Sequence, residues 1–511
     1  MATDAGHCAL GVVLIRRFQR PILYQQEVWQ RDVLPYPCFQ TRSSHSLVIM
    51  PEALPTCRPM SAPGLDTALR RHTIKRSEKG TSYAKGGEAA AMMDAYPTMN
   101  REGFTKRAIL GCCFLVLALV TLIGVFKTPL WGDELEYHFP LVLSISWKTI
   151  LDPHSTYSSA YAPLPFFMAS LVHRALPSLY AVRFLNWLVA LSCALVFRRM
   201  LSKESPSRDA ILLLFLSNPY FLRGSCTFHV TNYGLFFGLS ALFIYFYSNS
   251  RYRHAAAYLL MTMATLSMQW MLMLFIGISL YELRLCRTGD LSRRQFVGLA
   301  ALKLLASLPA FGLIWVWGGL THPNFKQYAL HPSFESANVV LAGLGFLFFF
   351  YSIFNILRLG WSEFVLIIVL APLLFIAQPV FAWKQGIGLF TGFESNLLRL
   401  VEAFTSVPYS ILLFGLALSG MVFCALAMKT ARTGVAQTGS YIALGLGSAY
   451  VGSVMLSSGH VYVMVPFLLL MLEGELSQRR GLLPCMNVQW YSAGVGYLLY
   501  YMLIKSHGAQ L

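Results

Sequence analysis

The chain has 511 residues, of which 56% are apolar and only 12% are charged. Ordinary soluble domains carry about 25% charged residues, so this composition excludes an ordinary soluble globular protein. The formal net charge is +17, but the basic residues lie in short groups between apolar runs. That arrangement is typical of loops facing the cytosol, and it indicates no nucleic-acid partner.

Residues 1–107 differ from the rest of the chain. They contain 15 Lys or Arg, 9 Asp or Glu, scattered Pro and Gly, and no sustained hydrophobic period. A short basic lead followed by an apolar run begins at Met99, which resembles the natural start of a membrane protein. We therefore expect 1–107 to be a disordered cytosolic extension, or the product of a start codon placed too far upstream, with no part in the chemistry.

Apolar runs long enough to cross a bilayer recur after this extension. A membrane-spanning helix needs about 20 mostly apolar residues. Counting the shorter candidates between the long runs, we predict an all-α polytopic membrane protein with about 12–13 transmembrane helices. The clearest runs are 108–126, 179–197, 232–248, 296–318, 337–357 and 407–427.

The basic groups between the runs orient the chain. Lys106 and Arg107 precede the first run, and the excess of Lys and Arg in cytosolic loops places them inside. The first helix then leads outward to WGDELEYH (131–138). Residues 134–150 are amphipathic, and residues 162–176 are short and begin next to a proline. We predict both segments to be helices lying along the membrane surface within the first external loop.

Continuing this orientation brings five polar stretches to the external face, while most predicted spans carry no charge. A transporter more often places polar and ionisable groups within its spans, near the bilayer midplane. The pattern therefore favours a site at the membrane surface acting on a lipid-anchored substrate, and a lipid or solute transporter is the alternative. The five stretches are 131–138, 223–232, 267–270, 321–336 and 457–462.

Asp133 and Glu134 open the first external loop. Adjacent side chains on a helix point about 100° apart, so these carboxylates do not face each other across one bond. A carboxylate beside apolar walls has a raised pKa and is a better base than one in water. Either one acid reacts while its neighbour binds or positions, or both simply begin a solvated helix, where the dipole favours acids.

The pattern Asp-Glu-x-x-Tyr-His-x-Pro at 133–140 resembles the first-loop signature of the GT-C membrane glycosyltransferases. That superfamily includes protein O-mannosyltransferases, aminoarabinose-transferase-type enzymes and dolichyl-phosphate-glucose-dependent glucosyltransferases. Four further segments, in the order in which such enzymes carry them, extend the resemblance. They are YAPLPFF (161–167), AVRFLNWLVAL (181–191), SNPYF (217–221) and VYVMVPFLLL (461–470).

The resemblance implies a membrane-integral glycosyltransferase without a cofactor. Such an enzyme moves a monosaccharide from a polyprenyl-phosphate donor to a glycan, lipid or protein acceptor on the extracytoplasmic face. It implies a catalytic role for Asp133 with Glu134 as its partner, a catalytic module at 108–295 and a C-terminal bundle at 296–511. The expected location is the inner membrane of a bacterium or the endoplasmic reticulum of a eukaryote.

Two departures from the family pattern bear on the other site residues. Where many relatives carry a second acid, this chain has FHVTNYG (228–234), so no metal site is expected. Val461 stands at the usual Arg position of the late segment, which leaves His460 or Arg223 to bind the donor phosphate. Arg223 has an alternative role as a lipid anchor, and Gln269 has one in a buried interhelical hydrogen bond. The expected substrate-binding residues are Tyr137, His138, Arg223, His229, Asn232, Gln269, His460 and Tyr462.

Overall fold

The computed structural model describes residues 101–128, 134–203, 205–324, 334–384, 393–429, 434–451, 458–479 and 481–508. The chain divides into two compact units, Met1–Glu78 and Lys79–Leu511, and every described residue belongs to the second. Asp133 and residues 1–100 of the predicted extension lie outside the described ranges.

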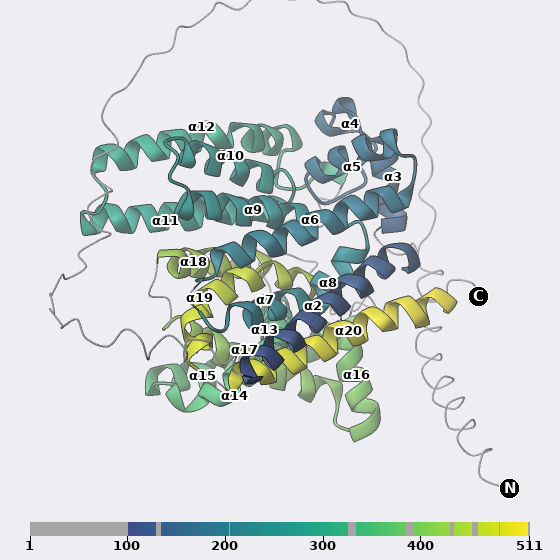
Figure 1. Cartoon of the computed structure of the whole chain (residues 1–511), viewed down its shortest axis with the longest axis vertical. Coiled ribbons are helices and arrows are strands. Elements are labelled where there is room, and N and C mark those ends of the chain that lie inside the picture. Colours follow the sequence, from purple (N-terminus) through teal and green to yellow (C-terminus); the bar gives the residue numbers. More distant parts are fainter. Residues whose placement is uncertain are drawn as a thin grey trace, which may run out of the picture. The chain divides into compact units, whose positions relative to one another are not determined.

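Within those ranges the ordered elements are helices, and no strand occurs (Figure 1). Four short elements are not α-helical: the π-helix η2 (Glu134–His138) and the 3₁₀ helices η3 (Gln269–Met271), η5 (Ile356–Arg358) and η6 (Ser458–Val463). The α-helices are α2 (Arg101–Lys127), α3 (Phe139–Ser144), α4 (Trp147–Leu151), α5 (Leu164–Ala175), α6 (Leu179–Met200), α7 (Arg208–Ser217), α8 (Pro219–Cys226), α9 (Val230–Tyr247), α10 (Arg253–Thr265), α11 (Leu272–Thr288), α12 (Arg293–Trp317), α13 (Phe334–Leu347), α14 (Phe349–Asn355), α15 (Trp361–Lys384), α16 (Phe393–Thr405), α17 (Tyr409–Ala427), α18 (Gly434–Val451), α19 (Val465–Gln478) and α20 (Leu482–Gly508).

The first described helix begins before the predicted end of the extension. Helix α2 already begins at Arg101, so residues 101–107 are helical. Residues 101–107 contain no proline, so nothing interrupts the backbone hydrogen bonds of a helix there. The helix of the apolar run therefore continues back through this basic segment.

In the part of the chain that the structure describes, six helical segments are long and apolar enough to cross a membrane, which confirms the predicted all-α polytopic class. A seventh is possible if α13 and α14, which meet at a 78° bend, form one broken span. Several other apolar helices, such as α7, α10 and α19, are shorter than a full span, and the larger count of about 12–13 crossings stays a prediction. The six segments are Ala108–Lys127, Leu179–Met200, Val230–Tyr247, Gln269–Thr288, Arg293–Trp317 and Tyr409–Ala427.

The segment between the first two of these spans forms short helices, as predicted. Pro140 lies in the first turn of α3, and the Ser146 side chain accepts a hydrogen bond from the Thr149 amide at the start of α4. Pro165 similarly lies in the first turn of α5. Because α3, α4 and α5 have only 6, 5 and 12 residues, none of them can cross a bilayer alone. Their place along the membrane surface stays a prediction.

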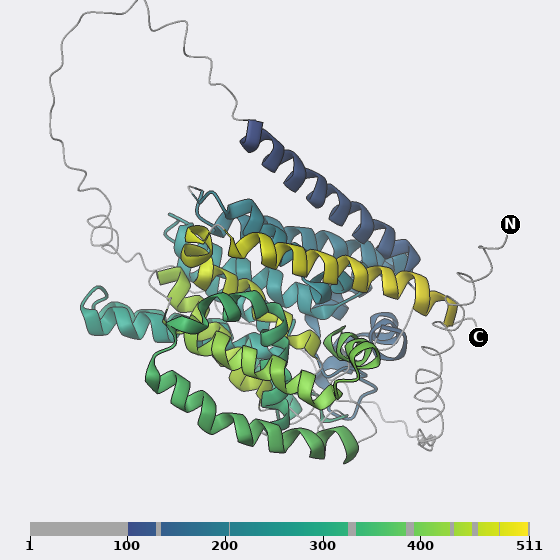
Figure 2. The same cartoon turned by 90° about the horizontal axis from the view of Figure 1, so that it is seen from below.

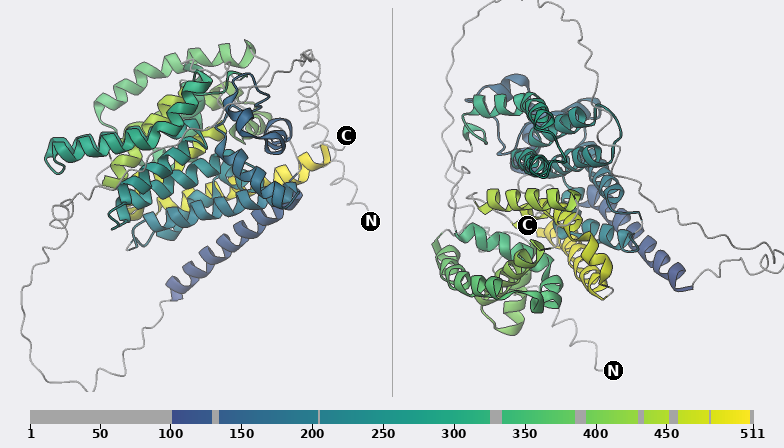
Figure 3. Two further views of the ribbon diagram at one scale, coloured as in Figure 1. Left: turned by 90° about the horizontal axis from the view of Figure 1, so that it is seen from above. Right: turned by 90° about the vertical axis from the view of Figure 1, so that its left-hand side faces the viewer.

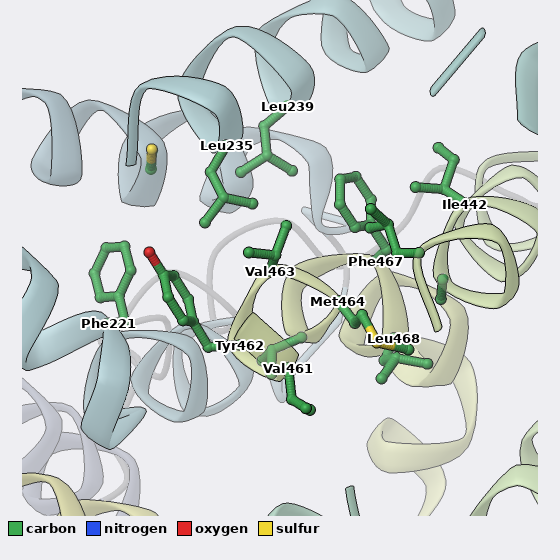
Figure 4. Close-up of a cluster of buried hydrophobic side chains, with 14 of the residues drawn as sticks. Phe221, Leu235, Leu239, Ile442, Val461, Tyr462, Val463, Met464, Phe467 and Leu468 are labelled. Carbon is green, nitrogen blue, oxygen red and sulfur yellow. The ribbon is translucent and has the colours of Figure 1, made fainter. Parts of the chain in front are cut away.

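The helices pack around a large apolar core that includes both halves of the chain, and a smaller second cluster lies among α2, α7, α8 and α20. Helix α9 lies between α6 and α10, while α18 packs on α11 and α20 on α7 and α8 (Figures 1 and 3). Figure 4 shows Leu235 and Leu239 of α9 close to Val463 of η6 and Phe467 of α19. The core thus combines helices from both predicted modules, 108–295 and 296–511.

Helices α13 and α17 pack side by side and make extensive contacts (Figure 2). Gly345 and Gly420 lie at this contact, and a Cβ atom at either position would collide with the backbone of the partner helix. Small residues allow two helix backbones to approach, which is how helices commonly associate in membranes.

One buried ion pair lies inside the spans, where the sequence predicted little charge. Lys303 of α12 donates to Oε2 of Glu282 in α11 and to the Ser279 hydroxyl at 2.8 Å. The Tyr245 and Tyr258 hydroxyls donate to Oε1 of the same carboxylate at 3.0 and 2.5 Å. Both carboxylate oxygens therefore have donors, as a charge buried among helices requires.

Replacing Tyr258 by Phe is expected to lower the free energy of unfolding by about 1.5–3 kcal/mol, because a hydrogen bond to a buried charge is lost. Titration of the purified protein with a denaturing detergent measures this change. Tyr252→Phe is the matched control, since the Tyr252 side chain is 61% exposed. Equal stability of the two variants would contradict the assigned role of the Tyr258 hydroxyl.

Candidate active site

The Arg-Phe-x-Asn segment of α6 places two long polar side chains on one helix face, because residues three apart are neighbours on a helix. The first of them, Arg183, forms a bidentate ion pair with Glu134, with Nε to Oε1 at 2.9 Å and Nη2 to Oε2 at 2.6 Å. Its Nη1 donates to the carbonyls of Thr128 at 2.7 Å and Val125 at 3.3 Å. The guanidinium thereby joins the end of α2, the first loop and α6.

Glu134 has a further partner in the short loop between α8 and α9, residues 227–229, which we call the second loop. Its Oε1 accepts the Phe228 amide at 2.8 Å, just before α9. The side chains of Glu134 and Arg183 are 4% and 1% exposed. With both oxygens occupied by buried donors, Glu134 has the contacts of a positioning residue that holds the start of the first loop against α6 and α9. Its expected part as catalytic partner of Asp133 stays a prediction.

The second residue of the segment, Asn186, holds the turn between α8 and α9. Its Nδ2 donates to the carbonyls of Gly224 at 2.7 Å and Thr227 at 2.6 Å. Asn232, expected to bind substrate, donates to the Gly224 carbonyl at 2.9 Å and is fully buried. These amides satisfy carbonyls that the end of α8 would otherwise leave unpaired. The structure therefore places Asn232 inside the turn, and its expected substrate-binding role stays a prediction.

The SNPYF segment forms the start of α8. The Asn218 side chain accepts the amides of Tyr220 and Phe221 at 3.0 and 3.2 Å, and Pro219 occupies the first helical position. Asn at the N-cap followed by Pro is a common helix start, so this local geometry follows from the sequence.

Helix α8 and the second loop bring together candidate residues from distant parts of the chain. The Tyr462 hydroxyl lies 3.3 Å from Nδ1 of His229, and the Tyr462 ring stacks with Tyr220 at a centroid distance of 6.5 Å. Arg223 donates to the Tyr497 hydroxyl of α20 at 3.3 Å. The sequence did not single out Tyr497, because a tyrosine in an apolar helix has no distinguishing pattern.

The two candidates at the end of the first-loop signature have different surroundings. Tyr137 is 39% exposed, and its backbone carbonyl accepts the Ser158 hydroxyl at 3.1 Å. His138 is buried with its ring edge-on to Phe166 and Phe228, at centroid distances of 5.5 and 6.1 Å. Tyr137 is thus accessible to a ligand, whereas His138 packs among aromatic rings.

Gln269 lies at the break between α10 and α11, at the start of the 3₁₀ helix η3. Its Nε2 donates to the Ala160 carbonyl at 3.0 Å, and the Leu164 amide donates to the Leu266 carbonyl at 3.0 Å. The Gln269 side chain is 6% exposed, and the partner of its hydrogen bond belongs to the first loop and not to another helix. Its expected substrate-binding role stays a prediction.

The end of α12 and the residues after it also contact the first loop. Trp317 Nε1 donates to the Ile150 carbonyl at 2.9 Å, and the Asn324 amide group donates to the Ser155 carbonyl at 2.9 Å. His322 packs against the Tyr157 ring, and burial lowers the pKa of the His322 imidazole below its ordinary value. The polar stretches 267–270, 321–336 and 457–462 thus each have a described residue in contact with the first or the second loop. The other two stretches include the start of the first loop and the whole of the second loop.

The structure does not describe the side chains of two of the candidate residues. Asp133 and the side chain of His460 are outside the described parts of the chain. Among the residues that the structure does describe, no three His, Cys, Asp or Glu side chains converge to hold a metal ion. The expected absence of a metal stays a prediction.

No family model matches the sequence, and no curated protein matches it. Among solved structures, the chain is similar to the crystal structure of ArnT from Cupriavidus metallidurans bound to undecaprenyl phosphate. The TM-score is 0.37 and the sequence identity 13%, over 79% of each chain. Neither a shared family nor a shared activity follows from a similarity at this level.

Proposed function

We propose that this protein is a membrane-integral glycosyltransferase that moves a monosaccharide from a polyprenyl-phosphate donor to an acceptor on the extracytoplasmic face. The main support is the convergence of the polar stretches on the first and second loops. The Glu134–Arg183 pair fixes the start of the first loop, directly after Asp133 in the chain, and Glu134 also holds the Phe228 amide of the second loop. A surface site for a lipid-anchored substrate needs such a fixed loop.

The proposed reaction is a displacement at the anomeric carbon. The acceptor hydroxyl oxygen forms a bond to this carbon, and the bond from the carbon to the phosphate oxygen breaks with inversion. Asp133 takes the hydroxyl proton, and the lipid phosphate leaves with the electron pair. Because phosphate is already a good leaving group, the acceptor needs a base while the phosphate needs cations or donors. Arg223, His229 and His460 are the proposed phosphate-binding residues.

An apolar cavity supports a lipid-linked donor. Its volume is about 390 Å³, and it lies among α13, α17, α18 and α19, lined by side chains such as Leu341, Leu344 and Leu468. Met464 also lines it, two residues after Tyr462, so the cavity adjoins the segment that contacts His229. An isoprenoid chain has the shape and polarity to enter such a cavity, because its burial there needs no hydrogen bonds.

The assay that tests this proposal supplies the purified protein with a panel of radiolabelled polyprenyl-phosphate sugars and an extract containing acceptors. We expect one donor to be consumed and its sugar to appear in a new product. An Asp133→Asn preparation is the control for contaminating enzymes. Consumption of no donor, or equal consumption by the control, would contradict the proposal.

The transporter alternative draws on the Glu282–Lys303 pair, because ionisable groups inside spans often mark transport pathways. However, the Glu282 oxygens are already taken by Lys303, Tyr245 and Tyr258. This closed arrangement favours a structural role. Vesicles containing the protein distinguish the two functions, since a transporter would move the lipid-linked sugar without breaking its sugar–phosphate bond.

We expect sugar transfer to persist after exhaustive chelation of divalent ions. Hard cations prefer several charged oxygen ligands, and FHVTNYG supplies only imidazole, hydroxyl and amide groups. The measurement is the rate of transfer after EDTA treatment and dialysis. Loss of activity, restored by magnesium or manganese, would contradict this prediction and indicate a third acid at the site, with Glu136 and Glu394 as candidates.

A further inference from the structure

The turn between α11 and α12 is a compact hairpin that carries a group of cations (Figure 1). Gly289 ends α11 with a φ of 83°, and the Leu291 amide donates to the Leu285 carbonyl at 3.1 Å. Ser292 and Gln295 form a capping box that begins α12. These contacts define the geometry of the turn without any contribution from its arginine side chains.

Four arginines surround this turn, and all four are exposed: Arg284, Arg287, Arg293 and Arg294. We call them the hairpin arginines. None of the ion pairs in the described part of the chain includes one of them. The acid within the turn, Asp290, accepts the Thr288 hydroxyl at 2.6 Å. The four hairpin arginines outnumber Asp290, so the surface around the turn has a net positive charge.

Helix stability does not explain the position of two of these residues. Arg293 and Arg294 occupy the first turn of α12, which contains no acid. The amino end of a helix has a partial positive charge, so cations there are unfavourable unless an anion lies nearby. No side chain within the described ranges supplies that anion by an ion pair, which indicates that it comes from outside the protein.

The surface next to the hairpin arginines indicates the chemical class of the anion that they bind. On α12 the Val297 side chain is 64% exposed, one turn after Arg293 and Arg294, and Leu304 and Leu305 are 62% and 64% exposed farther along. Exposed apolar groups on a helix able to span a membrane face lipid tails. The guanidinium groups therefore lie where the lipid-facing surface ends, at the level of the headgroup phosphates.

We infer that the hairpin arginines form a binding surface for anionic phospholipid headgroups. Each basic residue near an anionic membrane surface contributes favourable binding energy, and a group of four or more typically recognises anionic lipids. A soluble polyanion such as a nucleic acid would meet the same charges but would leave the adjoining apolar side chains exposed to water. This inference does not depend on the proposed transferase activity.

The test compares lipid binding by variants that lose two charges each. Arg293→Gln with Arg294→Gln is one test variant, and Arg284→Gln with Arg287→Gln is the second. The matched control is Lys148→Gln with Arg174→Gln, which removes two exposed cations from α4 and α5. Each protein is equilibrated with equal amounts of phosphatidylglycerol and phosphatidylcholine, and native mass spectrometry counts the retained lipids.

We expect each test variant to bind phosphatidylglycerol at least about fivefold more weakly, with phosphatidylcholine binding and the unfolding midpoint unchanged. The control should bind both lipids as the unaltered protein does. Equal phosphatidylglycerol binding by the test and control variants would overturn the inference. Displacement of the lipid by inorganic phosphate or a short oligonucleotide at equal phosphate concentration would also overturn it, since the surface would then be a general anion site.

Discussion

Replacing Asp133 by Asn is expected to reduce the rate of sugar transfer at least about hundredfold, the scale of a lost general base. Asparagine keeps the size and some hydrogen bonding of the residue but cannot accept the proton of the acceptor hydroxyl. Donor binding and the thermal unfolding midpoint should be largely unchanged. The measurements are single-turnover transfer, donor binding and thermal unfolding of the same preparation.

The matched control for this substitution is Asp152→Asn in the same loop. The Asp152 side chain accepts the His154 amide at 2.9 Å, which is a local turn contact. We expect transfer by this variant to remain near that of the unaltered protein. Near-normal turnover by Asp133→Asn would exclude Asp133 as the base, whatever the control does.

Breaking the Glu134–Arg183 pair is expected to have the largest effect on stability. Arg183→Met should lower the free energy of unfolding by about 3–5 kcal/mol, because Glu134 then remains as a buried charge without its cation. Glu134→Leu should have a similar effect, since it leaves the guanidinium unpaired. The double variant should recover much of this loss, because neither charge then remains buried alone.

Activity separates a positioning role from a purely stabilising one. If Glu134 positions the first loop, the double variant should fold yet transfer sugar poorly, since an apolar contact does not orient the loop. Recovery of transfer together with stability would contradict the positioning role. Arg198→Met is the control, because Arg198 and its partner Asp209 are 46% and 43% exposed, and such a pair contributes at most about 1 kcal/mol.

Several local features of this protein follow from the sequence alone. The all-α membrane class follows because apolar runs of sufficient length are a property of contiguous residues. The start of α8 at Asn218–Pro219 follows from the backbone and hydrogen-bonding preferences of those two residues. The spacing in Arg-Phe-x-Asn also predicts one shared helix face for Arg183 and Asn186.

Pairings between distant residues were decided only by the tertiary structure. The sequence makes Asp133 and Glu134 neighbouring candidate acids, but only the structure shows that Glu134 is held by Arg183 and by the Phe228 amide. Likewise, nothing in the apolar runs of α11 and α12 pairs Glu282 with Lys303. These contacts depend on which helix faces meet, and no local pattern encodes that choice.

The candidate site shows the same division. The sequence supplied His229 and Tyr462, but only the packing of η6 against α8 brings their side chains to 3.3 Å, and only α20 adds Tyr497 beside Arg223. Packing also placed Asn232 inside a turn. Residue type and order determined the membrane class and the candidate acids. Burial determined which polar groups bind the protein's own backbone, because a buried donor or acceptor must find a partner.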